Sequence, residues 1–145
     1  SADMADVVKS KAAEQDIIIM TAAVADFCPS HPADEKIKKN DSSYESVIEL
    51  ERTEDILSYL GAHKAKGQLI CGFSMETQNM LENSKAKLAK KNADMIVANN
   101  LKVAGAGFGT DTNVVTLITA DDCTELEIMD KSCVASRIMD RLLQM

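Results

Sequence analysis

The stretch IIIMTAAVAD, residues 17–26, decides the fold class. It begins with four consecutive large apolar residues, three of them β-branched, then becomes small and apolar, and ends in Asp26. Such a continuous apolar run predicts a strand that is buried on both faces, as in a parallel sheet. The small residues after it would let a ligand approach the backbone, and Asp26 offers an acceptor where the strand stops. A packed strand end with a turn-forming aspartate would have the same sequence.

Strand patterns and helix patterns alternate along the rest of the chain. Further strands are expected at Val47–Leu50, Gln68–Phe73 and Asp94–Ala98. Apolar residues at helical spacing predict helices over residues 2–14, Asn79–Asn92 and Ser132–Leu143. Another helix is expected after Thr53, which would be its N-cap, with Glu54 and Asp55 in its first turn. A hairpin around Asp121-Asp122 is expected from Val114–Thr119 and Glu125–Met129. We therefore predict a single α/β domain over residues 1–145: a Rossmann-like three-layer domain with a mainly parallel sheet and a C-terminal antiparallel hairpin.

The overall composition narrows the possible partners. The chain of 145 residues has a formal net charge of −7, which argues against nucleic acid or an anionic membrane as a partner. No apolar run approaches the roughly 20 residues that span a bilayer. Neither the four cysteines nor the two histidines show the spacing of metal ligands, so no metal site built from side chains is expected. Idle thiols suit a reducing compartment, and we expect a cytoplasmic protein.

Two groups of lysines could bind phosphate. The run Lys36-Ile37-Lys38-Lys39 lies on a long polar connection, residues 27–44, and such a loop can close over a polyphosphate. Lys87 and Lys91 are four residues apart and share one helix face. For the first pattern, a solvated charge run is the more common explanation. For the second, the solvent-exposed side of an amphipathic helix explains the spacing equally well.

The glycine-rich segment Gly105–Asn113 permits close backbone approach to a ligand. It is not a Walker sequence, because it lacks the ending GKS or GKT. The chain also lacks a strand–GxGxxG–helix fingerprint. This speaks against a nicotinamide-dependent oxidoreductase on a similar sheet.

Five segments, taken in order, resemble one family: AAVADF at 22–27, EKIKK at 35–39, GFSMET at 72–77, KLAKKNADMIVANN at 87–100 and GAGFGTDTNVVTLI at 105–118. The family is that of the bacterial, CTP-dependent phosphopantothenoylcysteine synthetases. The synthetase is usually the C-terminal half of a bifunctional protein whose other half is a flavin-dependent decarboxylase. The resemblance implies a homodimer, possibly fused to or associated with that decarboxylase, with no flavin on this chain.

The resemblance also implies a ligase reaction of coenzyme A biosynthesis. Phosphopantothenate attacks CTP through its carboxylate, which gives an acyl-cytidylate and pyrophosphate. The amine of cysteine then displaces CMP and forms the amide. Mg²⁺ is expected to arrive with CTP, held mainly by phosphate oxygens.

The same resemblance assigns roles to particular residues. Asp26 matches an aspartate that contacts cytidine, and Lys36 matches a loop lysine associated with catalysis and nucleotide binding. Ala22 and Ala23 are expected to bind the acyl substrate. The other nucleotide contacts are expected from a helix start, a base-pocket aromatic and the paired helix lysines, namely Glu54, Asp55, Ile56, Leu57, Phe73, Lys87 and Lys91.

Three positions depart from the family pattern. Thr53-Glu54 replaces the usual Asn-Pro, so the nucleotide contact there is expected from the backbone, and Cys28 stands where the family often has arginine. The Gly/Ser-rich strand and turn with which the family normally begins does not precede Ser1. We therefore expect an N-terminally shortened domain. The alternative to the ligase is a catalytically incomplete fragment that binds nucleotide and dimerises.

Overall fold

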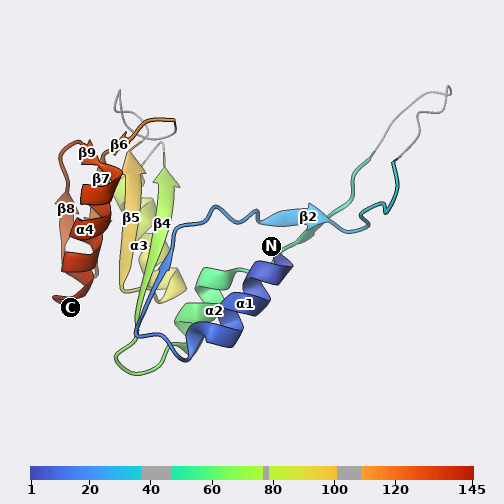
Figure 1. Cartoon of the computed structure of the whole chain (residues 1–145), viewed down its shortest axis with the longest axis horizontal. Coiled ribbons are helices and arrows are strands. Elements are labelled where there is room, and N and C mark those ends of the chain that lie inside the picture. The colour runs from blue at the N-terminus through green and yellow to red at the C-terminus, as the bar shows by residue number, and fades with distance from the viewer. Residues whose placement is uncertain (37–46, 77–78, 101–108) are drawn as a thin grey trace.

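A five-stranded sheet forms the centre of the molecule in the computed structural model, which describes residues 1–36, 47–76, 79–100 and 109–145. Its strands, in spatial order, are β1 (Ile17–Met20), β4 (Leu69–Glu76), β5 (Met95–Asn100), β7 (Val115–Ile118) and β8 (Cys123–Glu125). The first three run parallel, and β7 and β8 are each antiparallel to the strand before them (Figure 1). This arrangement confirms the predicted fold class.

Helices cover both faces of the sheet. On one face, α4 (Lys131–Leu142) packs Val134, Ile138 and Leu142 against Cys71 and Val97 of the sheet. On the opposite face, Ile70 packs against α1 (Ala2–Ala12) and α2 (Ile56–His63), and α3 (Met80–Lys91) lies beside α2. Successive strand residues point to opposite faces, so the apolar runs serve both helical layers.

The strand Ile17–Met20 is the edge of the central sheet, because only β4 pairs with it among the described residues. All four of its residues are half-buried. Ile17 and Ile19 pack against one core cluster, and Ile18 and Met20 pack against the other, so the strand is covered on both faces as predicted, but only in part. An edge strand has a neighbour on one side only, which leaves part of each side chain uncovered.

A second, two-stranded sheet forms an arm that extends away from the central sheet (Figure 1). Strand β2 (Phe27–Pro29) pairs antiparallel with β3 (Leu50–Arg52). The sequence placed Phe27–Pro29 in a polar connection and a strand at Val47–Leu50, and the structure corrects both. The observed strand begins at Leu50 because its pairing partner, Phe27–Pro29, sets its register.

The C-terminal hairpin is confirmed, but its second strand differs from the prediction. Strand β8 covers Cys123–Glu125 and so starts earlier than predicted, because the turn between Thr119 and Asp122 is tight, with the Thr119 amide donating to the Asp122 carbonyl at 2.9 Å. Of the rest of the expected strand, only Met129 is in a strand, β9 (Met129–Asp130), which pairs with β6 (Thr112–Asn113). Residues 126–128 connect β8 to β9.

Helix α2 begins later than predicted. Its N-cap is Asp55, whose carboxylate accepts a hydrogen bond from the Ser58 amide at 2.9 Å. Thr53 is therefore not the cap. Its amide donates instead to the Asp26 carbonyl at 3.0 Å, and its hydroxyl donates to the Ala25 carbonyl. Thr53 thus joins the segment after β1 to the start of α2.

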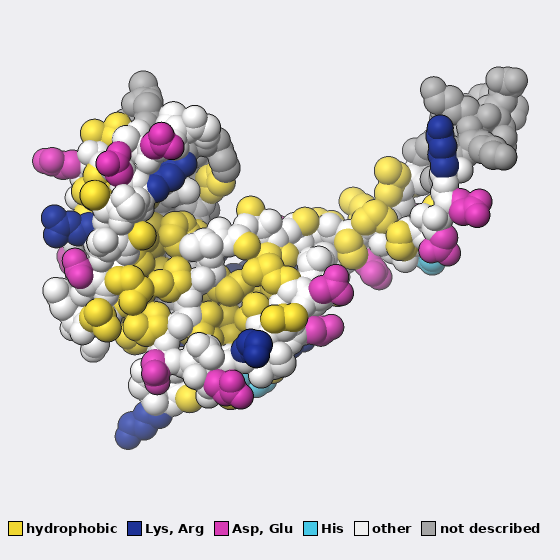
Figure 2. Space-filling view, in the orientation of Figure 1, with side chains coloured by type: hydrophobic (Ala, Val, Ile, Leu, Met, Phe, Trp, Pro, Cys, Tyr) yellow, Lys and Arg dark blue, Asp and Glu magenta, His cyan; other side chains and the backbone are white. Residues whose placement is uncertain are grey.

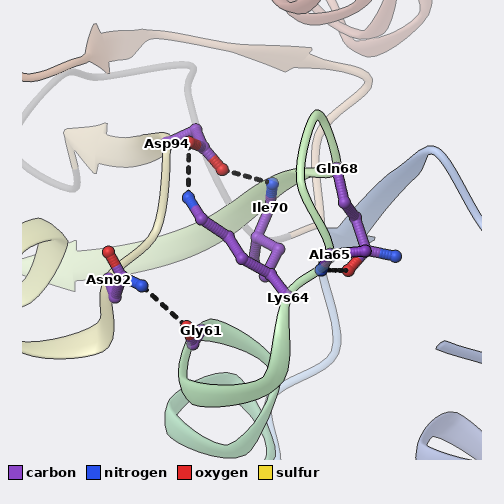
Figure 3. A network of polar contacts seen from close by, with 7 residues as sticks. All are labelled: Gly61, Lys64, Ala65, Gln68, Ile70, Asn92 and Asp94. Carbon is purple, nitrogen blue, oxygen red and sulfur yellow. Dashed lines mark hydrogen bonds and ion pairs between the residues drawn. The ribbon is translucent and has the colours of Figure 1, made fainter. Parts of the chain in front are cut away.

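A polar network fixes α2 and α3 to the amino ends of the strands (Figure 3). The Asp94 carboxylate accepts from the Ile70 amide at 2.8 Å and pairs with the Lys64 ammonium group at 2.7 Å. The side-chain amide of Asn92 donates to the Gly61 carbonyl at 2.7 Å. These contacts link the end of α2, the start of β4 and the α3–β5 junction. Among the described residues, no helix combines the length and apolarity needed to cross a membrane.

Candidate functional site

A cavity of about 160 Å³ opens beyond the end of β1, between the start of α2 and the side of α3. Ligands of open parallel sheets bind at this position, outside the carboxyl ends of the strands. The cavity is lined by an apolar floor, three carboxylate residues and two lysines, in chain order Met20, Ala22, Val24, Ala25, Asp26, Thr53, Glu54, Asp55, Ile56, Leu57, Phe73, Lys87 and Lys91.

All the predicted site residues line this cavity except Ala23 and Lys36. Ala23 is exposed between the lining residues Ala22 and Val24. Lys36 is also exposed, and the segment after β2 that carries it runs away from the central sheet (Figure 1). The remainder of the lysine run, residues 37–39, and the first part of the glycine-rich segment, residues 105–108, lie outside the described residues.

The paired helix lysines are held in the cavity wall by protein acceptors. The ammonium group of Lys87 donates to the Phe73 carbonyl at 2.8 Å. Lys91 forms an ion pair with Asp55 and donates to the Ser58 hydroxyl at 3.0 Å. The Lys91 side chain is only 14% exposed. Lys87 and Lys91 therefore face the cavity and do not belong to the solvated side of this helix.

Asp55 has two roles at the start of α2, since it caps the helix and neutralises Lys91. Partial burial alone would raise the pKa of its carboxyl, but hydrogen bonds from Lys91 and Ser58 outweigh that effect and hold the pKa below its usual value. Asp55 is therefore ionised near neutral pH. Its charge also competes with any anion for Lys91 and for the free amides of the helix N-terminus.

Of the three carboxylates that line the cavity, only that of Asp26 forms no hydrogen bond or ion pair with the described part of the chain. It is exposed, so it is free to accept hydrogen bonds from the hydroxyl or amino groups of a ligand. Within the described ranges, no group of three or more His, Cys, Asp or Glu residues could hold a metal ion.

Sequence reasoning missed several residues of the site. Met20 and Val24 form part of the apolar floor, and Ser58 holds Lys91. Lys9 of α1 reaches Glu54, which is 45 positions away in the sequence. A local pattern cannot predict such a contact, because it depends on how α1 packs on α2.

Cys28 lies outside the cavity lining, half-buried on the arm, with its sulfur 3.8 Å from a carboxylate oxygen of Glu51. All four cysteines lie in described residues and are free thiols. The structure therefore places Cys28 on the arm rather than beside the paired lysines.

These features define a class of protein: a Rossmann-like α/β domain with a lysine-bearing polar cavity at the carboxyl edge of its sheet. The family described as "DNA/pantothenate metabolism flavoprotein C-terminal domain" matches residues 1–145, and the chain belongs to this family. This membership confirms the resemblance to the synthetase domain.

Individual relatives support the assignment. The chain is 47% identical over 143 residues to the coenzyme A biosynthesis bifunctional protein CoaBC of Bacillus subtilis, which covers 98% of this chain and 34% of that protein. It is also 47% identical over 131 residues to a prokaryotic cysteine/cysteine sulfinic acid decarboxylase, covering 90% of this chain and 36% of that protein. The chain thus spans about a third of the length of these relatives.

A solved structure shows the same fold. The C-terminal domain of a coenzyme A biosynthesis bifunctional protein CoaBC superposes with a TM-score of 0.77 and 40% sequence identity. The match covers 99% of this chain and 63% of that one.

Proposed function

We propose that the chain provides the nucleotide-binding part of a CTP-dependent phosphopantothenate–cysteine ligase. One observation carries the proposal: a single cavity is lined by residues from three separate parts of the chain. These residues are Asp26 after β1, Phe73 of β4, and Lys87 and Lys91 of α3. The family membership and the name of the Bacillus subtilis relative support the assignment to coenzyme A biosynthesis.

The reaction has two steps in this proposal. The carboxylate of phosphopantothenate attacks the α-phosphorus of CTP, which forms an acyl-cytidylate and releases pyrophosphate. The amine of cysteine then attacks the acyl carbon, forms the amide and releases CMP. The negative charge that shifts between phosphate oxygens during the first step needs fixed cations.

The cavity residues have distinct roles in this scheme. When CTP binds, Lys87 leaves the Phe73 carbonyl and Lys91 leaves Asp55, and both lysines bind phosphate oxygens instead. Asp26 accepts hydrogen bonds from the cytidine. Phe73, whose side chain packs against the core cluster on the α4 face, contributes its backbone to the cavity wall. The backbone of residues 54–57 contributes further nucleotide contacts, and Ala22 and Ala23 leave room for phosphopantothenate.

Mg²⁺ enters with CTP in this proposal and neutralises phosphate charge. Phosphate oxygens and water would supply most of its ligands, because Glu54 and Asp55 are paired with lysines and Asp26 is assigned to the cytidine. The free cysteines fit a reducing cytoplasm. A flavin-dependent decarboxylase, fused or associated, would supply a second activity, in keeping with the word bifunctional in the name of the Bacillus subtilis relative.

The cavity holds only part of a nucleotide, because pockets for ligands of this size usually measure roughly 300–1,000 Å³. We infer that the remaining walls come from the segment around Lys36 and from a second copy of the chain. The arm supports a homodimer, since it exposes Phe27, Val47, Ile48 and Leu50, which are between 48% and 81% exposed (Figure 2). Apolar surface of this kind usually marks an interface.

A combined assay tests the proposal. CTP should raise the unfolding temperature, by mass action on the folded state, and pyrophosphate should appear only when CTP and phosphopantothenate are both present. Lys36→Gln should abolish pyrophosphate release, whereas the matched change Lys85→Gln, on the exposed side of α3, should not. Stabilisation by CTP without pyrophosphate would favour the incomplete, nucleotide-binding fragment. No stabilisation by CTP would contradict both versions.

A further inference from the structure

Glu54 brings a carboxylate to the cavity, and Lys9 of α1 holds it. The two side chains form an ion pair in which they are 43% and 27% exposed, respectively. The ammonium group of Lys9 also lies 4.9 Å from the ring centroid of Tyr59, and Tyr59 stacks on His63 with the ring centroids 4.1 Å apart. Lys9 is thus fixed by a charged contact and an aromatic contact, both on the α2 side of the cavity.

The balance of charge in the cavity makes this ion pair important. Three carboxylate residues and two lysines line the cavity, which gives a net charge of −1. Lys91 already neutralises Asp55, so an unpaired Glu54 would present an additional full negative charge to an incoming polyphosphate. Lys9 is not part of the lining, and its charge brings the total to zero.

We propose that Lys9 is a positioning residue of the nucleotide site, which draws the Glu54 carboxylate towards α1 and neutralises it so that a nucleoside polyphosphate can enter. This inference rests on the proposed function. Because Lys9 acts through Glu54 and does not line the cavity, its effect must depend on the charge of the ligand and on the presence of that carboxylate. A role limited to attaching α1 to α2 would show neither dependence.

Isothermal titration calorimetry at low ionic strength provides the test. Lys9→Met should weaken CTP binding by roughly tenfold, because it leaves a carboxylate unpaired near the phosphates. The double variant Lys9→Met/Glu54→Gln should regain most of the affinity. Lys11→Met is the matched control, since Lys11 is an exposed lysine of the same helix. Added salt should narrow the difference between Lys9→Met and the unchanged chain.

Each outcome has a defined meaning. Equal CTP affinity of the Lys9→Met and Lys11→Met variants would overturn the inference. A loss that Glu54→Gln does not restore, or an equal loss for uncharged cytidine, would also overturn it, because either result indicates a purely structural role for Lys9. If the unchanged chain binds no CTP, the proposed function itself fails, and the inference about Lys9 fails with it. Circular dichroism of each variant confirms that the differences arise in folded protein.

Discussion

A Cβ atom at position 61 would lie 1.8 Å from the carbonyl oxygen of Lys91, so the backbones of α2 and α3 pack directly against each other at Gly61. The hydrogen bond from Asn92 to the Gly61 carbonyl holds the same crossing, at 2.7 Å. Lys91 is also the cavity lysine that pairs with Asp55. The contact between Gly61 and Lys91 therefore helps to position Lys91, a lysine that is a candidate to bind phosphate.

The first prediction concerns Gly61→Ala. In a helix free of neighbours this change would stabilise the protein by about 1 kcal/mol. Here the added methyl group meets backbone atoms that cannot rotate away, and we expect a loss of about 2–3 kcal/mol in the free energy of unfolding. Urea denaturation measures the change, and weaker CTP binding should accompany it because Lys91 is displaced.

Ala62→Gly is the control for that experiment, since Ala62 is an exposed neighbour in the same helix. This change should lower the free energy of unfolding by about 1 kcal/mol through helix propensity alone and leave the CTP affinity unchanged. A Gly61→Ala variant as stable as the unchanged protein would show that the two helices can separate without cost.

The second prediction concerns the polar network of Figure 3. Asp94→Ala removes the acceptor of the Ile70 amide, and Ile70 is fully buried. We expect a loss of about 1–3 kcal/mol, because the amide is left unsatisfied. Lys64→Met removes only the ion pair and should cost less. Comparison of the two free energies of unfolding tests the order, and a larger loss for Lys64→Met would contradict it.

The third prediction is a pH dependence that belongs to Asp55. Its pKa in the folded protein lies below the ordinary value of 3.8, because hydrogen bonds from Lys91 and Ser58 outweigh the opposing effect of burial. The contribution of ionised Asp55 to the free energy of unfolding is therefore complete above the pKa that Asp55 has in the unfolded chain. It is lost as the pH falls through the pKa of Asp55 in the folded protein. Asp55→Asn retains a capping oxygen but cannot titrate, so its stability should fall less between about pH 5 and pH 2.

Denaturation curves recorded across that pH range measure the effect. Asp121→Asn, in the exposed turn of the hairpin, controls for the general loss of a carboxylate. If the Asp55→Asn and Asp121→Asn variants lose stability in parallel, the ion pair with Lys91 has no measurable role.

The fourth prediction concerns thiol reactivity. Burial, with a smaller contribution from Asp94, raises the pKa of Cys71 to about 12, and a neutral thiol is a poor nucleophile. In native protein at mildly alkaline pH, a disulfide reagent should modify the exposed Cys123 and Cys133 and spare Cys71. Mass spectrometry locates the adducts, and denatured protein serves as the control in which all the thiols react. Rapid native modification of Cys71 would show that this part of the core opens.

Much of the fold could be predicted because its elements depend on local patterns. The apolar runs that begin at Ile17, Leu69 and Met95 are the parallel strands, and the helix predicted over Asn79–Asn92 is α3 within one residue at each end. The predictions failed where pairing or capping decides the outcome. The start of β3 depends on its pairing with Phe27–Pro29. The start of α2 depends on which side chain caps it: Asp55 accepts from the Ser58 amide, whereas the Thr53 hydroxyl donates to the Ala25 carbonyl.

Neighbouring residues and their spacing are enough to predict an AAVAD strand end and two lysines on one helix face. Tertiary packing is what places these features in one cavity, pairs Lys91 with Asp55 and brings Lys9 of α1 to Glu54. These contacts join residues 36 and 45 positions apart. They exist because α1, α2 and α3 pack on one face of the sheet, an arrangement that no local spacing encodes.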